Sequence, residues 1–234
     1  MRKLFFSALC CLIFLLQASC STGETYAPVT DLSNIERIPK TGMYRVAKGE
    51  TLYSISFRYG LDYRTLAEWN NIKSPYTIQR NQLISLRYKS AVRTHSPQKT
   101  STPVVKENEP HYSVSKWTWP TRGKIINGFS ANNKGINIAG QQAEAIYSVA
   151  SGKVVYNGDG LRGYGNLIII KHNNLYLSAY AHCRRSFVKD GEWVKQGQKI
   201  AEMGSTGTDK TMLHFEIRRA GIPVDPLSLF SRYN

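Results

Sequence analysis

Five positions in the C-terminal third of the chain mix side chains that bind zinc with side chains that do not: Asn133, Asn137, His182, Met212 and His214. A catalytic zinc needs three ligands of the His, Cys, Asp or Glu type and one open position for water. Asn offers only a weak, neutral carbonyl oxygen, and the Met thioether prefers softer metals such as Cu(I). Without zinc, nothing lowers the pKa of an attacking water towards ~7. This set therefore predicts no cofactor and no hydrolysis.

The sequence around these positions resembles the LytM (lysostaphin-type) zinc peptidase domain, whose signature is H-x-G-x-D, a lone His and H-x-H. The corresponding stretches here are Asn133-Lys134-Gly135-Ile136-Asn137, Tyr180-Ala181-His182 and Met212-Leu213-His214. In that family the first His, the Asp and the last His hold zinc, while the other two His serve the catalytic water. The resemblance therefore implies an intact fold with a degenerate metal site, because Asn133, Asn137 and Met212 replace three of the five.

The first residues indicate an exported lipoprotein. Arg2-Lys3 precedes a largely apolar stretch from Leu4 to Leu16 that is too short to span a membrane, and Ala18-Ser19-Cys20 follows. This site resembles a bacterial lipobox, although Gln17 stands where an apolar residue is preferred. It implies a signal peptide over residues 1–19 and a lipidated Cys20, with ordinary signal-peptidase cleavage as the alternative. The residues after Cys20 resemble an outer-membrane sorting signal. We therefore expect a lipid anchor in the inner leaflet of the outer membrane, with the protein facing the periplasm.

The chain carries a net charge of +15, which by itself argues only for non-specific attraction to anions. No recognition helix, zinc finger or RNA-binding sheet motif accompanies the charge, so lipid head groups, wall polymers or an acidic protein are expected as partners rather than nucleic acid. Cys183 stands beside His182, but neighbours on a strand point to opposite faces. A small buried side chain is therefore expected at Cys183 rather than a nucleophile.

Residues 43–88 closely resemble a LysM domain. Tyr44 and Val46 alternate as a short strand, Thr51 is placed to cap a helix, and Gly60 suits the end of that helix. A second helix from Tyr63 to Trp69 and a returning strand from Leu83 to Leu86 complete the expected β-α-α-β order. The resemblance implies binding of N-acetylglucosamine chains, chiefly peptidoglycan, in a groove between two loops. The groove residues it implies are Gly49, Glu50, Thr51, Leu52, Pro75, Tyr76, Ile78 and Gln79.

Two polar segments separate the parts of the chain. Residues 20–42 predict a flexible tether, and residues 89–116 predict a basic flexible linker that would let the two modules move independently. Residues 117–234 are predicted to be all-β, because short apolar runs alternate with glycines at turns. The expected fold is a small β-α-α-β module followed by an antiparallel β-sheet LytM-like domain with a groove.

Lipobox, LysM module, basic linker and degenerate LytM domain in this order resemble the NlpD-type murein hydrolase activators of Gram-negative bacteria. That resemblance implies a non-catalytic envelope lipoprotein that activates a periplasmic N-acetylmuramoyl-L-alanine amidase for septal wall splitting and daughter-cell separation, at the division site. The groove would capture a regulatory segment of the amidase and relieve its autoinhibition. The expected groove residues are Asn133, Asn137, Arg162, Tyr164, His182, Met212 and His214.

Two rival readings stay open at this point. The first is an active zinc endopeptidase in which Asp159 or Glu216 approaches the site as an unrecognised ligand. The second is a purely structural wall tether, in which the LysM module carries all of the function and the C-terminal domain is a relic. Zinc content separates the first rival from a degenerate site, and loss of residues 117–234 without a phenotype would support the second.

Overall fold

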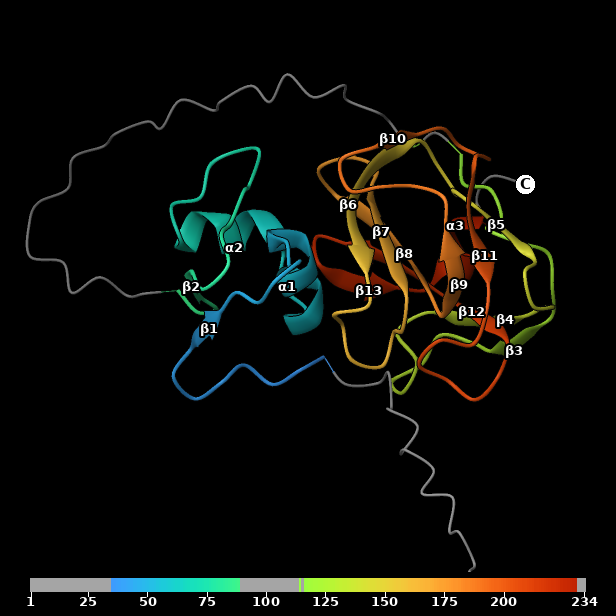
Figure 1. Ribbon diagram of the computed structural model, residues 1–234, viewed down its shortest axis with the longest axis horizontal. Coiled ribbons are helices and arrows are strands. Elements are labelled where there is room, and N and C mark those ends of the chain that lie inside the picture. The colour runs from blue at the N-terminus through green and yellow to red at the C-terminus, as the bar shows by residue number, and fades with distance from the viewer. Residues whose placement is uncertain (1–34, 89–113, 115, 231–234) are drawn as a thin grey trace, which may run out of the picture.

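The computed structural model describes residues 35–88, 114 and 116–230, which form an N-terminal module (residues 35–88) and a C-terminal module (residues 116–230) (Figure 1). The predicted signal peptide, the lipidation site Cys20 and the predicted linker up to residue 113 lie outside the described residues. Within the described ranges, no helix has the length and apolar character needed to cross a membrane.

The N-terminal module has the predicted β-α-α-β order. β1 (Met43–Arg45) pairs antiparallel with β2 (Leu83–Ser85), and α1 (Leu52–Tyr59) and α2 (Tyr63–Trp69) lie between them in the chain. The Thr51 side chain accepts a hydrogen bond from the backbone N–H of Ser54 at 3.1 Å, and Gly60 ends α1 with a φ of 64°. These contacts confirm the predicted caps. The caps could be predicted because both depend on local sequence.

The C-terminal module consists of two antiparallel sheets and a short helix, so the predicted fold class is confirmed. The large sheet has the order β10-β6-β7-β8-β12-β4-β3, and β13 pairs with β12. Its strands are β3 (Ile125–Asn127), β4 (Ile136–Ala139), β6 (Gly152–Gly158), β7 (Leu167–Lys171), β8 (Tyr176–Ala181), β10 (Trp193–Val194), β12 (Met212–Arg219) and β13 (Ile222–Val224). The small sheet contains β5 (Ala145–Tyr147), β11 (Lys199–Met203) and β9 (Cys183–Ser186), and α3 spans Pro226–Phe230.

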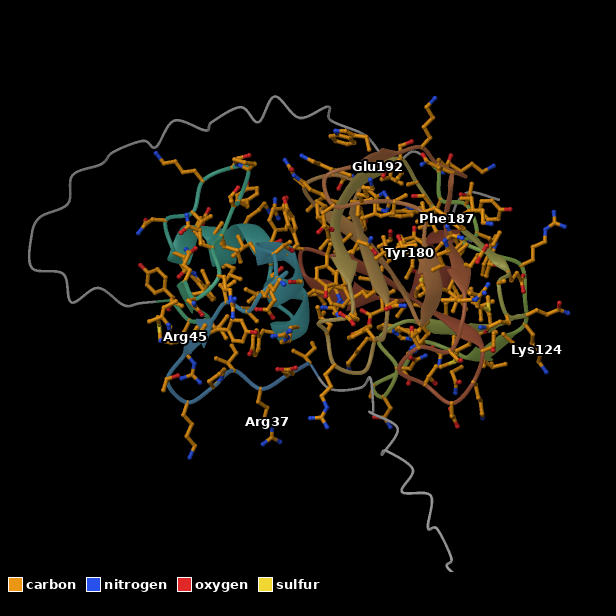
Figure 2. All side chains as sticks on the ribbon, viewed as in Figure 1. Arg37, Arg45, Lys124, Tyr180, Phe187 and Glu192 are labelled. Atoms are coloured by element: carbon orange, nitrogen blue, oxygen red, sulfur yellow. The ribbon has the colours of Figure 1, made fainter. Side chains whose placement is uncertain are left out.

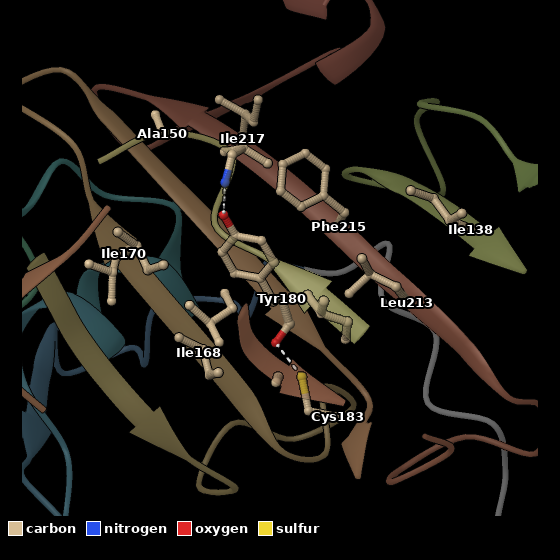
Figure 3. Close-up of a cluster of buried hydrophobic side chains, with 14 of the residues drawn as sticks. Ile138, Ala150, Ile168, Ile170, Tyr180, Cys183, Leu213, Phe215 and Ile217 are labelled. Carbon is tan, nitrogen blue, oxygen red and sulfur yellow. Dashed lines mark hydrogen bonds between the residues drawn. The ribbon is translucent and has the colours of Figure 1, made fainter. Parts of the chain in front are cut away.

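The main core lies between the two sheets, around Tyr180 and Phe215 (Figure 3). The Tyr180 hydroxyl accepts a hydrogen bond from the backbone N–H of Val149 at 3.0 Å, and the Cys183 thiol donates to the Tyr180 carbonyl at 3.4 Å. Burial raises the pKa of the Cys183 thiol to about 12, so the thiolate needed for nucleophilic attack is not formed near neutral pH. The prediction of a small buried side chain at this position is confirmed.

The opposite face of the large sheet is covered by the N-terminal module, with α1 lying against β6 (Figure 1). Tyr53 and Phe57 of α1 and Tyr63 of α2 share one apolar cluster with side chains of β6, β7 and β8. The sheet residues of that cluster include Val155, Tyr156, Leu167, Ile169, Ala179 and Ala181. This contact differs from the predicted independent movement of the modules, because a shared apolar surface favours a docked arrangement.

Hydrogen bonds and one close backbone approach accompany the docking. The Thr51 hydroxyl donates to the carbonyl of Val155 at 3.1 Å, and the Arg58 guanidinium donates to the carbonyl of Gly160 at 3.0 Å. A Cβ atom on Gly221 would lie 2.4 Å from the carbonyl oxygen of Leu61, so only glycine permits this close approach of the two backbone segments. The last part of the predicted tether also contacts the module, since the N–H of Glu36 donates to the carbonyl of Arg58 at 3.1 Å.

Candidate functional site

Two of the residues predicted to line the groove lie where β4 and β12 run side by side on the large sheet. Their register sets Asn137 of β4 directly opposite His214 of β12. Alternate residues of a strand point to opposite faces. On β12, Leu213, Phe215 and Ile217 face the core between the sheets, so Met212, His214, Glu216 and Arg218 share the face on which the N-terminal module docks.

A chain of buried polar contacts runs along this face from the groove to α1. Asn137 Oδ1 lies 2.7 Å from His214 Nδ1, and His214 Nε2 lies 3.1 Å from Glu216 Oε1. Arg218 Nε donates to Glu216 Oε2 at 2.8 Å, and Arg218 Nη1 donates to the carbonyl of Phe57 in α1 at 2.5 Å. The groove and the docked module are therefore joined by one continuous set of side chains.

Glu216 is the charged centre of this network. Its side chain is fully buried, and its Oε1 also accepts a hydrogen bond from the Tyr164 hydroxyl at 2.7 Å. Burial alone would raise the pKa of Glu216, but the Arg218 charge and the contacts with His214 and Arg218 outweigh burial and lower it to about 2. Glu216 is thus an anion at neutral pH, held by Arg218 on one side and by Tyr164 and His214 on the other.

These donors do not fit a zinc ion. Three positions hold zinc in the LytM peptidases that this sequence resembles, and of these only His214 is a residue that binds zinc. Its Nδ1 is in contact with the Asn137 amide. Glu216, named above as a candidate extra ligand, is ion-paired with Arg218. Across the described ranges, no three His, Cys, Asp or Glu side chains are grouped as a metal site requires.

Among the described residues predicted for the groove, only His182 has a buried polar side-chain atom without a hydrogen-bond partner. Its Nδ1 lies 2.8 Å from the carbonyl of Thr206, which can only accept, so Nδ1 carries the proton and Nε2 is left as an acceptor. Nε2 is buried without a hydrogen-bond partner, and the His182 ring lies 6.2 Å from the ring of His214. A group that donates a hydrogen bond would therefore complete the site.

Acid is expected to destabilise the fold through two buried histidines. Burial lowers the pKa of His172 and of His182 from 6.5 to about 4. The unfolded chain takes up these protons below pH 6.5 and the folded chain only below about 4, so stability is complete above pH 6.5 and falls as the pH drops from 6.5 to 4. The loss in the free energy of unfolding is on the order of 3 kcal/mol per histidine.

Urea unfolding at neutral pH and near pH 4 measures this loss. A His172→Gln variant should show a shallower dependence of its unfolding free energy on pH. Equal free energies of unfolding at both pH values would contradict the expectation.

The other predicted groove residues lie at different depths. The Asn133 amide nitrogen donates to the carbonyls of Gly128 and Gly135 at 2.9 and 3.0 Å, so it holds its own loop rather than contacting His214. Met212 is nearly buried at the start of β12. Arg162 is exposed and lines a small cavity of about 20 Å³ at the junction of the modules, together with Tyr164 and Arg218. The structure brings Asn137, His182, Tyr164 and His214 together; the roles predicted for all these residues remain predictions.

The predicted glycan loops lie at the junction with the C-terminal module. Five of the eight predicted residues line a cleft there: Glu50, Thr51, Pro75, Tyr76 and Ile78. Leu52 is fully buried in the module's own core, and Gly49 and Gln79 lie outside the cleft lining. The Glu50 carboxylate accepts a hydrogen bond from the Tyr44 hydroxyl at 2.7 Å and forms an ion pair with Arg58 at 2.7 Å. These contacts hold Glu50 within the fold of its own module. The cleft also includes Tyr53 and Thr77, which sequence analysis did not assign to the glycan groove.

Sequence analysis missed two buried members of the network, Arg218 and Phe57. Arg218 is 1% exposed, and its guanidinium carbon lies 3.3 Å from the centre of the Phe57 ring. A signal was present in β7, whose run Leu167-Ile168-Ile169-Ile170 shows no polar alternation. Such a run is typical of a strand buried on both faces, which requires a cover on the second face of the sheet.

Two family models match the two modules of this chain. Peptidase family M23 matches residues 131–226, and the LysM domain matches residues 44–87. The chain is 45% identical over 236 residues to a lipoprotein NlpD/LppB homolog of Pseudomonas aeruginosa, covering 84% of this chain and 80% of the relative. It is 38% identical over 263 residues to the murein hydrolase activator NlpD of Salmonella dublin, covering 83% and 70%. A solved structure of the lysostaphin catalytic domain from Staphylococcus simulans covers 50% of this chain and 92% of its own, at 25% identity and a TM-score of 0.41.

Proposed function

This chain belongs to the NlpD/LppB lipoprotein family, and from that premise we propose that it binds peptidoglycan and activates a cell-wall hydrolase without cutting the wall itself. Relatives at 38% identity are named murein hydrolase activators rather than peptidases. The partner is a periplasmic N-acetylmuramoyl-L-alanine amidase, and the site of action is the septal wall during daughter-cell separation. Cys20 anchors the chain to the inner leaflet of the outer membrane, in keeping with relatives named as lipoproteins.

One observation carries the proposal: the Asn137 amide and the His214 imidazole are hydrogen-bonded to each other at 2.7 Å. In the LytM peptidases that the sequence resembles, the residues at these two positions hold zinc. The groove keeps its strands and its register but lacks the ligands that would activate water. A preserved surface that lacks its chemistry favours binding over cutting. The hydrolytic chemistry, including any metal, then resides in the partner.

His182 gives the groove a means of holding a partner segment. Its buried Nε2 accepts a hydrogen bond from an N–H or O–H group of the amidase segment that enters the groove. The segment is held more tightly in the open state of the amidase than in the closed state, and this difference in affinity shifts the amidase towards its active population. Met212, next to the groove, adapts its thioether side chain to the shape of the segment.

Dye release from labelled peptidoglycan tests the proposal. The mature chain alone should release no dye, a periplasmic amidase alone should release little, and the mixture should release dye at a clearly higher rate. A His182→Leu variant should activate about tenfold less, since the segment's donor then stays unpaired in a buried site. Lys124→Ala, an exposed change just before the edge strand β3 and outside the residues predicted for the groove, serves as the control and should activate normally (Figure 2).

Each other outcome has a defined meaning. Release by the chain alone that a chelator abolishes would replace the activator with an active zinc endopeptidase. Normal activation by His182→Leu would remove the role of Nε2 while leaving the activator intact. No release from any mixture of the chain with periplasmic amidases would leave the structural wall tether.

A further inference from the structure

A cleft of about 260 Å³ opens between the two modules, and both of them line it. The N-terminal module contributes the loops on which the predicted glycan residues lie. The C-terminal module contributes β6 and the turn before β10. The lining includes Glu50, Thr51, Tyr76 and Ile78 on one wall and Lys153, Val155 and Asp190 on the other.

The floor of the cleft is fixed by the docking contact itself. The hydroxyl of Thr51, in the first glycan loop, donates to the carbonyl of Val155 on β6 at 3.1 Å, and both residues line the cleft. One side of the glycan loops therefore faces the C-terminal module in this arrangement. A ligand that enters them meets the sheet of the C-terminal module on its other side.

The N-terminal wall combines polar residues, Glu50 and Thr51, with an aromatic ring, that of Tyr76. Tyr76 has a φ of 62°, and its ring packs edge-on against Tyr53 and Tyr63, with ring centres 6.1 and 5.4 Å apart. An aromatic residue in the left-handed region is uncommon and is held there by its surroundings. Together with Ile78, the ring offers a fixed apolar surface suited to the C–H face of a sugar ring.

The C-terminal wall is charged. Lys153 on β6 lies with its ammonium 5.8 Å from the centre of the half-exposed Trp193 ring, and Asp190 lies on the neighbouring turn. A lysine ammonium attracts a carboxylate, and an aspartate accepts hydrogen bonds from amide N–H and hydroxyl groups. A sugar that carries both an acetamido group and a free acid would match this pair of side chains.

The C-terminal wall distinguishes peptidoglycan glycans by their charge. A lactyl group that still carries its peptide is a neutral amide at that point, whereas a free lactyl carboxylate is an anion that the Lys153 ammonium attracts. Cleavage of the amide between the lactyl group of N-acetylmuramic acid and its peptide leaves this free carboxylate and no peptide on the glycan. Such a strand carries the acid that Lys153 would contact.

We infer that the glycan site of this chain is composite, with the LysM loops binding an N-acetylated, peptide-free glycan while Lys153 and Asp190 of the C-terminal module contact its lactyl carboxylate and its acetamido N–H. This inference rests on the proposed binding of peptidoglycan by the LysM loops. Because the glycan then contacts both modules, it binds the docked arrangement more tightly than separated modules and holds them together.

Calorimetric titration of the full mature chain with a GlcNAc–MurNAc tetrasaccharide bearing free lactyl carboxylates tests the composite site. Lys153→Glu should weaken binding about tenfold, because repulsion replaces attraction at close range. Lys153→Arg, which keeps the charge, should stay within about twofold of the unaltered chain. Lys124→Glu makes the same change of charge at the exposed far end of the sheet and should leave binding unchanged (Figure 2).

A neutral N-acetylglucosamine tetrasaccharide serves as the second probe and should respond less to Lys153→Glu than the acidic one. Tyr76→Ala should weaken binding of both probes. If the unaltered chain binds neither probe, the proposed wall binding fails and the composite site fails with it. If Tyr76→Ala weakens binding while Lys153→Glu behaves like Lys124→Glu, wall binding stands and the composite site is overturned.

Discussion

An Arg218→Met variant is expected to lose about 3–5 kcal/mol of its free energy of unfolding. Arg218 is 1% exposed and pairs with the fully buried Glu216 at 2.8 Å, so its removal leaves a carboxylate inside the protein without its cation. Arg218 also donates to the Phe57 carbonyl near the C-terminal end of α1, where a positive charge is favourable. Urea unfolding of the two chains, followed by circular dichroism, measures the difference.

The neighbouring arginine offers a matched control. Arg219 is exposed at the end of β12, and Arg219→Met should change the free energy of unfolding by no more than about 0.5 kcal/mol. Adding Glu216→Gln to Arg218→Met should recover part of the loss, because the unpaired buried charge is then gone. If Arg218→Met behaves like Arg219→Met, the buried pair does not stabilise the docked fold.

An Asn133→His/Asn137→Asp double variant is expected to bind zinc at least about a thousandfold more tightly than the unaltered chain. The two changes supply an imidazole at position 133 and a carboxylate at position 137. With His214 these give the three ligands that a zinc site with one open position needs. The Asn137→Asp change also replaces the amide that contacts His214 Nδ1 at 2.7 Å. Zinc content after purification without metal and dialysis against zinc gives the stoichiometry, and competition with a chelator gives the affinity.

The single variants separate ligand identity from geometry. Asn133→His and Asn137→Asp alone each give two ligands and should bind zinc far more weakly than the double variant. A double variant that takes up no zinc would show that the loop held by Asn133 no longer places its side chain near the site. Zinc uptake by the unaltered chain equal to that of the double variant would overturn the degenerate site and restore the endopeptidase reading.

The N-terminal module could be predicted almost element by element. Thr51 and Gly60 mark the two ends of α1 because capping depends on residues a few positions away. The predicted second helix has the observed bounds, Tyr63–Trp69, for the same reason. For the C-terminal module, short apolar runs between glycines predicted an antiparallel β fold, and the resemblance predicted which strands carry the site.

The site itself was predictable only in its residue types. The Asn residues at positions 133 and 137 are visible in the sequence, and ligand chemistry depends on the residue type. The pairing of Asn137 with His214 and the buried acceptor of His182 depend on strand register and on the left-handed backbone at His182, with a φ of 64°. Neither feature can be derived from spacing along the chain.

The sequence by itself determined the order of the modules, the local elements of the first and the residue types at the candidate site of the second, since each depends on residue type and short-range spacing. Only the tertiary structure decided that the two modules dock. Docking buries Arg218 against α1 and places Lys153 beside the glycan loops. The physical reason is that an arginine or lysine on a strand usually faces water, and only a cover brought from a distant part of the chain changes its environment.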